Sequence, residues 1–256
     1  MPRVAILDCD GEPTADGGDD GGLMGTNAAD WLREEGDEPS AWTWVHLRVK
    51  NRPEELPRSA EEFDGYVVPG SRAMVTERGA WMEPVSELIR QAHARGLPLV
   101  GICFGHQLIA DALGGEVETR AGAQPFNCAV DEIELTESAA AAGLGAGPLR
   151  LMKGHSQHVV ALPPGATLLG SSPSTPIEIF SLGATVLCCQ GHPDFGLDLA
   201  SKAILPAMES AGLVSAERAA SVAAAMRPDA PHPVDNDLLK ARFRELLQSG
   251  STAPRL

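Results

Sequence analysis

The sequence predicts an α/β fold in which a mostly parallel sheet carries helices on both faces. Short apolar runs, of the kind that form buried strands, alternate with stretches of helical periodicity through the first half of the chain. Glycines and prolines punctuate the ends of these segments. Strands that alternate with helices favour a parallel sheet, because each helix carries the chain back to the edge where the next strand begins.

The individual elements follow from the apolar runs and the turn signals. The predicted strands are 4–7, 42–49, 66–68, 97–102, 133–135, 159–162, 177–180 and 186–189. The predicted helices are 27–35, 85–95, 104–113, 197–210, 215–226 and 235–248. The stretch 10–25 is rich in Gly and Asp and is predicted to be a loop.

Composition and charge disfavour several classes of protein. Twenty Lys and Arg against 35 Asp and Glu give a net charge of −15 at pH 7, whereas nucleic-acid-binding proteins usually present a basic face. Apolar runs of membrane-spanning length and a secretory signal are both missing, so we expect a soluble cytoplasmic protein without a membrane partner. The five scattered cysteines resemble neither a disulfide framework nor a zinc ligand set.

The negative charge is concentrated near the N-terminus. Residues 8–38 hold eleven acidic residues and one basic residue, a net charge of −10. A solvated loop and helix face is one explanation of this segment. The other is that residues 10–20 overhang a pocket at the carboxyl end of the first strand. There they would select a cationic or amine-bearing substrate group or a basic partner.

The most informative segment surrounds Cys103, where a predicted buried strand turns sharply into a predicted helix. Gly101 and Gly105 flank this cysteine at two residues on either side, which is typical of a nucleophile elbow because strand and helix can then cross closely. A helix N-terminus lowers the pKa of a thiol, and the backbone N–H of Phe104 can face a developing oxyanion. Cys103 is therefore a candidate nucleophile, the alternative being a structural cysteine between two packing glycines.

A thiol nucleophile needs a base, and the base needs an acceptor that orients it. His192 and Asp194 follow the predicted strand 186–189, two residues apart. In extended chain this spacing points both side chains the same way. The imidazole can then reach Cys103 while the carboxylate holds its other nitrogen, although an ordinary surface turn is the alternative.

These motifs together resemble those of the class I glutamine amidotransferases, in which a Cys–His–Glu triad hydrolyses the γ-amide of glutamine through a thioester. GICFGHQ at 101–107, followed by ALGG, is similar to the nucleophile motif of that family, and FDGYVVPGS at 63–71 is similar to its oxyanion strand. KGHSQHV at 153–159 resembles its His-x-Asp-x-Val segment, and QGHPD at 190–194 resembles its His-Pro-Glu segment. The stand-alone γ-glutamyl peptidase branch is the most similar.

The resemblance implies a flavodoxin-like α/β fold with the class I amidotransferase architecture. It implies one domain over residues 1–256, with a core of roughly 1–212 and a C-terminal helical extension at 213–256. The implied reaction is hydrolysis of a γ-glutamyl amide in a small-molecule substrate, without a metal or an organic cofactor. If the substrate is glutamine, the ammonia released implies a synthase partner, whereas a γ-glutamyl peptide or conjugate suits a stand-alone enzyme.

The resemblance also assigns roles to particular residues. It implies a catalytic triad of Cys103, His192 and Asp194. It implies an oxyanion hole made by Gly70, Ser71 and Phe104. It also implies that the substrate is lined by Gln107, His155, Ser156 and Gln157. Two positions depart from the family pattern. Asp194 is one methylene shorter than the usual Glu, and Gln157 replaces the usual Asp, which puts in question how a substrate α-amino group is held.

Two other classes of function stay open at this point. Residues 5–11 are similar to the opening motif of haloacid-dehalogenase-type phosphatases, where Asp8 is a nucleophile and Asp10 a general acid beside Mg²⁺. Ser71, Lys153 and Asp194 with Asp198 could complete such a site, although Cys103 is then unexplained. The chain could also be a catalytically degenerate amidotransferase-like domain used for binding. The two departures suggest this second class, and intact Cys103 and His192 argue against it.

Overall fold

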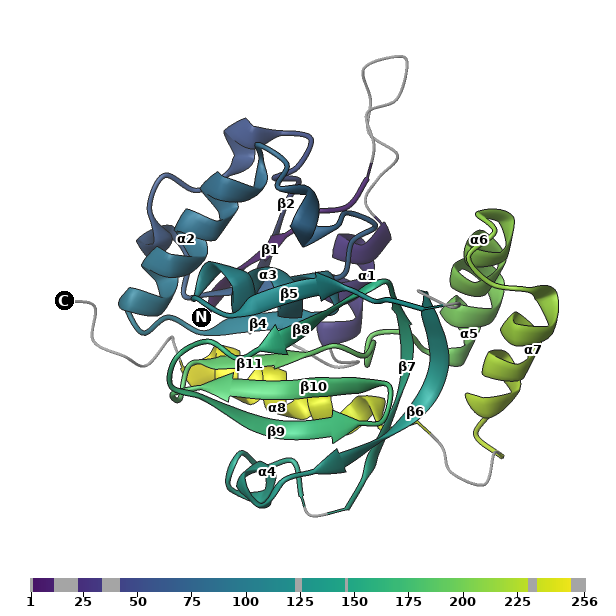
Figure 1. Cartoon of the computed structure of the whole chain (residues 1–256). Coiled ribbons are helices and arrows are strands. Elements are labelled where there is room, and N and C mark those ends of the chain that lie inside the picture. The colour runs from purple at the N-terminus through teal and green to yellow at the C-terminus, as the bar shows by residue number, and fades with distance from the viewer. Residues whose placement is uncertain are drawn as a thin grey trace.

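The structure is a computed structural model that describes residues 2–11, 23–33, 42–122, 126–145, 147–229 and 234–249. Figure 1 shows a central sheet with helices on both faces and a separate group of helices at one side. Within the described residues, no helix combines the length and the apolar character that crossing a membrane requires.

Nine of the described strands form the central sheet, in the order β2-β1-β3-β4-β11-β10-β9-β6-β7. They are β1 (Arg3–Leu7), β2 (Thr43–Leu47), β3 (Gly65–Val68), β4 (Leu99–Ile102), β6 (Asn127–Leu135), β7 (Leu149–His155), β9 (Ala166–Ser172), β10 (Thr175–Leu182) and β11 (Val186–Cys189). Neighbouring strands are parallel from β2 to β11 and antiparallel from β11 to β7. A small second sheet pairs β5 (Glu116–Thr119) with β8 (Gln157–Ala161).

The helices lie in three groups around this sheet. They are α1 (Leu23–Leu32), α2 (Met82–Ala94), α3 (Phe104–Ala112), α4 (Glu137–Ala141), α5 (Leu197–Leu199), α6 (Leu205–Ser210), α7 (Ala216–Ala225) and α8 (Asn236–Ser249). A π-helical turn over Ala200–Ile204 joins α5 to α6. Figure 1 shows α2 and α3 on one face of the sheet, α1 and α8 on the other, and α5, α6 and α7 beside β6 and β7.

The alternation of side chains along β1 divides the apolar interior into two cores. Ala5 and Leu7 pack with residues of α2 and α3, whereas Val4 and Ile6 pack with residues of α1 and α8. Successive residues of a strand face opposite sides of the sheet, so a strand covered on both faces is apolar throughout. This explains why the parallel strands appear in the sequence as unbroken apolar runs.

The α/β fold with a parallel sheet and helices on both faces is confirmed. Three strands, β5, β7 and β9, were not predicted, because β5 is mostly exposed and β7 carries the buried charge of Lys153. The first helix begins at Leu23 rather than at residue 27, so residues 23–25 of the predicted loop are helical. The rest of that loop, from residue 12 to residue 22, lies outside the described residues.

Helix α8 packs directly against the central sheet. Its residues Leu239, Phe243 and Leu247 recur at a spacing of four and are fully buried in the same core as Val100 of β4. The division of the chain near residue 212 stays a prediction, but the last helix is part of the sheet's own core.

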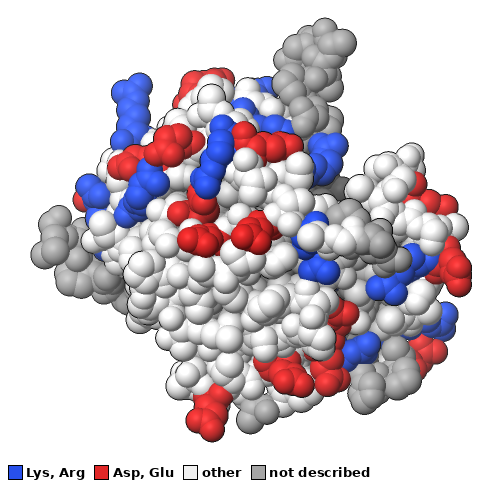
Figure 2. Space-filling view, in the orientation of Figure 1, with Lys and Arg blue, Asp and Glu red and all other residues white. Residues whose placement is uncertain are grey.

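Surface charge of both signs is interspersed over the α2 side of the molecule. Arg90 pairs with Glu83 and Glu87, and Arg95 pairs with Glu61. Figure 2 shows these mixed colours over α2 and a broad uncharged surface over β9 and β10. Most acidic residues of the 8–38 segment lie outside the described residues, so its predicted role at the pocket stays a prediction.

The fold depends on a glycine where α3 crosses β3. A Cβ atom at Gly105 would lie 1.8 Å from the backbone oxygen of Val68. We therefore expect Gly105→Ala to push α3 off the sheet and to lower the free energy of unfolding by about 3 kcal/mol or more. Urea unfolding followed by circular dichroism measures this loss.

Gly147→Ala is the matched control, because no atom of the described residues lies within 4 Å of the position that its Cβ would take. We expect this variant to change the free energy of unfolding by less than about 0.5 kcal/mol. Equal stability of the two variants would contradict the close crossing.

Candidate active site

Cys103 occupies a strained turn between β4 and α3. Its backbone has φ 51° and ψ −102°, in a region that residues with a Cβ atom rarely adopt and that costs about 1–3 kcal/mol. The Cys103 N–H donates to the backbone oxygen of Cys189 on β11 (2.9 Å), and its carbonyl accepts from Gln107 N–H (3.1 Å). The strain is therefore held by the neighbouring strand on one side and by the helix on the other.

The two flanking glycines make this turn possible. A Cβ atom on Gly101 would lie 2.8 Å from the backbone of Gly105, so strand and helix cross here at backbone contact distance. Gly105 N–H donates to the carbonyl of Pro69 (3.2 Å). This bond brings the turn after β3, which contains Gly70 and Ser71, against the start of α3. The nucleophile-elbow geometry that the sequence predicts is present.

His192 lies beyond the end of β11 and is almost completely buried. Its backbone N–H donates to Met152 O (2.8 Å), and its Nδ1 lies 3.1 Å from Asp194 Oδ1. The ring of Phe195 stacks on the imidazole at a centroid distance of 3.9 Å. A Cβ atom on Gly70 would lie 2.8 Å from His192 Cε1. The imidazole is thus held by hydrogen bonds, by stacking and by the space that a glycine leaves.

The charge environment favours a protonated imidazole. Burial by itself lowers the pKa of His192, but the negative charges of Cys103 and Asp194 and the ring's hydrogen bonds to both side chains raise it to about 10. An imidazolium beside a sulfur nucleophile is the arrangement that activates cysteine hydrolases. Cys103 and His192 line the same cavity, and Asp194 holds the imidazole from the other side.

Asn27 of α1 is a site residue that the sequence analysis missed. Its Nδ2 donates to Asp194 Oδ2 (2.9 Å) and to the backbone oxygen of Asp194 (3.0 Å). The carboxylate therefore accepts from Asn27 with one oxygen and holds His192 with the other. The two residues are 167 positions apart, and Asn27 belongs to no recognisable motif, so only the folded chain reveals the contact.

The predicted substrate-lining residues brace one another at the opposite end of the site. Gln107 Nε2 donates to Gln157 O (2.8 Å) and to Gln190 Oε1 (3.0 Å). His155 Nδ1 lies 2.8 Å from the same Gln157 oxygen. Burial lowers the pKa of His155 to about 3 despite this bond. The ring is therefore neutral, and it supports Gln157 through a hydrogen bond and not through a positive charge.

Gln157 has an acceptor to offer a ligand. Its Nε2 donates to Thr76 Oγ1 (2.5 Å) and Thr119 Oγ1 (3.0 Å). Its Oε1 is buried and has no hydrogen-bond partner among the described residues. A buried acceptor without a donor is costly, so a substrate N–H group at this atom would relieve an unmet hydrogen bond.

Of the predicted oxyanion-hole residues, Ser71 and Phe104 line the same cavity as Cys103, and Gly70 lies against His192. Phe104 is the first residue of α3, and a backbone N–H in the first turn of a helix has no intrahelical acceptor. The Ser71 hydroxyl donates to Cys9 O (2.6 Å) and accepts from Ala73 N–H (3.0 Å). Because that hydroxyl holds its own turn, the predicted role of Gly70 and Ser71 falls to their backbone N–H groups.

A cavity of about 540 Å³ joins these groups. Eight of the ten predicted site residues line it: Ser71, Cys103, Phe104, Gln107, His155, Ser156, Gln157 and His192. Gly70 lies against the imidazole edge, and the carboxylate of Asp194 is fully buried where it holds the ring. The ion pair of Asp10 with Arg72 also borders the cavity.

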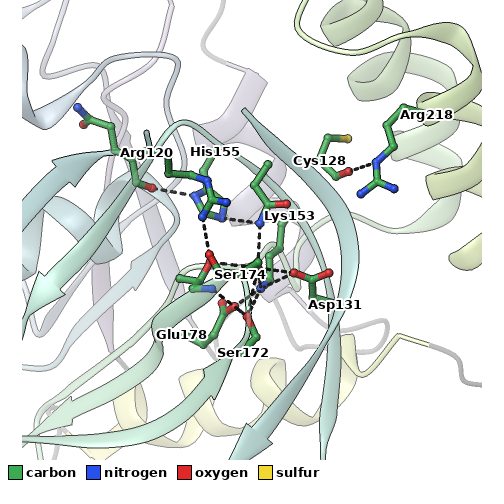
Figure 3. Close-up of polar contacts among 12 residues, drawn as sticks. Arg120, Cys128, Asp131, Lys153, His155, Ser172, Ser174, Glu178 and Arg218 are labelled. Atoms are coloured by element: carbon green, nitrogen blue, oxygen red, sulfur yellow. Dashed lines mark hydrogen bonds and ion pairs between the residues drawn. The ribbon is translucent and has the colours of Figure 1, made fainter. Parts of the chain in front are cut away.

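A buried ionic network supports the strand that carries His155. Figure 3 shows Lys153 surrounded by Glu178, Asp131, Ser172 and Ser174. Lys153 is fully buried, and its Nζ lies 3.0 Å from Asp131 Oδ2 and contacts the carboxylate of Glu178. A buried cation between two carboxylates is stable only as a complete set. This lysine does not line the cavity and serves the framework of β7.

The two aspartates of the phosphatase alternative form hydrogen bonds with other residues of the chain. Asp8 is fully buried, with Oδ2 2.7 Å from His46 Nε2 and Oδ1 accepting from the backbone N–H of Asp10 (2.9 Å). Asp10 Oδ1 accepts from Arg72 N–H and Nε–H at 3.0 and 3.1 Å. Asp8 therefore has no open face toward a substrate.

The sequence model of the family described as glutamine amidotransferase class-I matches residues 41–208. The chain belongs to this family. Gamma-glutamyl peptidase 4 of Arabidopsis thaliana is 33% identical over 169 residues, which are 64% of this chain and 66% of that protein. A putative glutamine amidotransferase of Saccharomyces cerevisiae is 38% identical over 114 residues, 44% of this chain and 43% of that protein. The family membership overturns the phosphatase alternative.

Solved structures of glutamine amidotransferases share the fold over nearly the whole chain. One from Thermotoga maritima covers 98% of this chain and 99% of its own, with a TM-score of 0.68 at 20% identity. One from Methylobacillus flagellatus covers 97% of this chain and 90% of its own, with a TM-score of 0.62 at 20% identity. The flavodoxin-like class I amidotransferase architecture predicted from the sequence is thereby confirmed.

The cysteines of this chain differ in reactivity, which gives a test of the site that needs no substrate. Burial raises the pKa of the thiols of Cys9, Cys128, Cys188 and Cys189, whereas Cys103 opens onto the cavity beside His192. We expect iodoacetamide at neutral pH to modify Cys103 selectively, as measured by peptide mass spectrometry.

His192→Gln removes the imidazolium and is expected to slow this alkylation about tenfold or more. His93→Gln is the matched control on α2, outside the lining of the cavity, and should alkylate at the unchanged rate. Uniform labelling of all five cysteines, or no effect of His192→Gln, would count against the activated sulfur.

Proposed function

We propose that the protein is a thiol hydrolase that cleaves γ-glutamyl amide bonds through a thioester on Cys103. The observation that carries the proposal is the strained backbone of Cys103, which lines a cavity of about 540 Å³ together with His192, whose imidazole Asp194 holds. Family membership and the similarity to Gamma-glutamyl peptidase 4 support the class of reaction.

The mechanism divides amide hydrolysis into two steps. Cys103 Sγ attacks the γ-carbonyl carbon, and backbone N–H groups of Phe104 and of the Gly70–Ser71 turn stabilise the oxyanion that forms. The C–N bond then breaks, and His192 gives its proton to the departing nitrogen. In the second step His192 takes a proton from water, which attacks the thioester and releases glutamate from the sulfur.

The glutamyl group fits the polar end of the cavity. Its α-ammonium group is a donor, and the free Oε1 of Gln157 is a buried acceptor in the wall. Gln107, which also lines the cavity, holds the backbone of Gln157 in place through its amide nitrogen. Gln157 can therefore do as a neutral acceptor what the family's Asp does as a charged one.

Asn27 compensates for the shorter acid of the triad. Asp194 has one methylene fewer than Glu, so its carboxylate needs another contact to stay beneath the imidazole. Two hydrogen bonds from Asn27 Nδ2, to the side chain and to the backbone of Asp194, supply that contact. Cys103 and His192 line the same cavity, which also argues against a degenerate binding domain. The cytoplasmic location and the synthase partner stay predictions.

Glutamate release tests the proposal directly. We expect the wild-type protein to release glutamate from at least one of glutamine, γ-glutamyl peptides and γ-glutamyl amides, measured by an enzymatic glutamate assay. Cys103→Ala should lower the rate by about a thousandfold or more, because the acyl intermediate can no longer form. The absence of release from every substrate, or an alanine variant as fast as the wild type, would overturn the mechanism.

The raised pKa of His192 sets a pH limit on the reaction. Departure of the amine needs the protonated ring, so kcat/KM should fall as the pH rises through about 10, where His192 loses its proton. Asp194→Asn removes one of the charges that raise this pKa, so the alkaline fall should move to lower pH. An unchanged alkaline limb in Asp194→Asn would show that another group controls it.

Asn27→Ala tests whether Asn27 positions Asp194 without contributing to substrate binding. Loss of the contact to Asp194 should lower kcat about tenfold, with KM changed much less, because Asn27 is not among the described residues that line the cavity. Thr26→Ala, an exposed neighbour on α1, is the matched control and should retain the wild-type kcat. A fall in KM and kcat together, or equal effects of both variants, would argue for a merely structural role.

A further inference from the structure

The cavity has two chemically different ends. The polar end holds Gln107, His155, Ser156 and Gln157, as described above. The other end, which we call the apolar wall, consists of six large side chains. They are Met24, Phe126, Phe195, Ile204, Met208 and Leu213. The apolar wall carries no charged side chain.

The apolar wall starts at the catalytic groups. Phe195 stacks on His192 and packs with Ala200 and Ile204, in an apolar cluster separate from the two cores of the central sheet. A Cβ atom on Gly154 would lie 2.4 Å from the methyl carbon of Met208, and Gly154 O lies 3.9 Å from Cys103 Sγ. The wall therefore runs outward from the reacting sulfur and from the imidazole that protonates the leaving group.

The outer part of the wall is held in place by the end of α6. Gly212 has φ 70°, and its N–H donates to Glu209 O (2.9 Å), while Leu213 N–H donates to Met208 O (3.0 Å). These bonds terminate the helix in a left-handed cap that positions the next side chain. Leu213 is 47% exposed, which makes it the one exposed large hydrophobic residue among those described. Leu213 therefore adds solvent-accessible apolar surface to the lining of the cavity.

We propose that the apolar wall binds an uncharged alkyl or aryl substituent on the leaving amine, so that the substrates are γ-glutamyl amides of apolar amines. This inference rests on the proposed function. The glutamyl half carries an ammonium and a carboxylate and needs the polar end, because charged groups are costly against hydrocarbon. The departing nitrogen receives its proton from His192, which Phe195 covers, so the substituent on that nitrogen meets the wall.

The size of the cavity agrees with a substituted amine. About 540 Å³ is in the range of pockets that hold drug-sized ligands, whereas glutamine is a much smaller molecule and its leaving group is ammonia. No co-reactant other than water is required: the C–N bond breaks, the amine departs with the proton from His192, and water releases glutamate.

A homologous series of substrates tests the inference. We expect kcat/KM to rise from glutamine through γ-glutamylmethylamide to γ-glutamylbutylamide by about fourfold for each methylene that the wall buries. γ-Glutamylglycine, which brings a carboxylate to the wall, should be a poorer substrate than γ-glutamylpropylamide. Glutamine as good as the butylamide, or the glycine compound better than the propylamide, would overturn the inference.

Variants of Leu213 test whether the apolar wall creates the preference for longer alkyl substituents. Leu213→Ser should lower the ratio of kcat/KM for the butylamide to that for glutamine about tenfold, and Leu213→Met should keep the ratio. The side chain is half exposed, so both variants are expected to fold, which thermal unfolding checks. An unchanged ratio in Leu213→Ser, where the wild type prefers the butylamide, would show that another surface creates the preference.

Binding to Cys103→Ala, measured by calorimetry, separates this inference from the proposed function. Tighter binding of the butylamide than of glutamine, without cleavage by the wild type, supports the wall and overturns the hydrolase. Cleavage of all amides at equal kcat/KM supports the hydrolase and overturns the wall. Neither binding nor cleavage overturns both.

Discussion

The strained backbone of Cys103 is the constraint on which the rest of the site depends. The turn exists because β11 accepts its N–H, because Gly101 and Gly105 allow strand and helix to touch, and because Pro69 receives the N–H of Gly105. Each of these contacts also places another part of the site. The bond to β11 brings the segment of His192 alongside, and the bond to Pro69 brings the oxyanion turn. These backbone contacts by themselves therefore bring the three segments of the site together.

The catalytic motifs could be predicted from the sequence because each is local. An elbow needs two glycines at a set spacing, and a histidine and its orienting acid can share one extended segment. Contacts across the fold left no such trace. Asn27 reaches Asp194 from a helix far away in the sequence, and the apolar wall draws on segments scattered from Met24 to Leu213. The antiparallel flank was hard to recognise for a related reason, since buried Lys153 interrupts the apolar pattern of β7.

In the proposed function, the polar end of the cavity binds the glutamyl group and the apolar wall binds the leaving amine. Gln157 presents an unmet acceptor where the family has an acid, and a neutral acceptor discriminates by hydrogen bonding rather than by charge. The opposite end has hydrocarbon without charge next to the proton donor. Under the proposed function, the two departures from the family pattern have different explanations. Asp194 is compensated by a new neighbour, whereas Gln157 is compensated by the chemistry of its own amide.

The order of the strands in the sheet has a consequence for the synthesis of the chain. Strand β4, which ends at the nucleophile, lies between β3 and β11, and β11 is the last of the sheet's described strands along the chain. A nascent chain that has not yet made β11 holds an ordinary relaxed cysteine without its histidine. The hydrogen bond that holds the strained turn of Cys103 therefore cannot form, and His192 cannot join Cys103 at the cavity, until β11 and the residues after it have been synthesised.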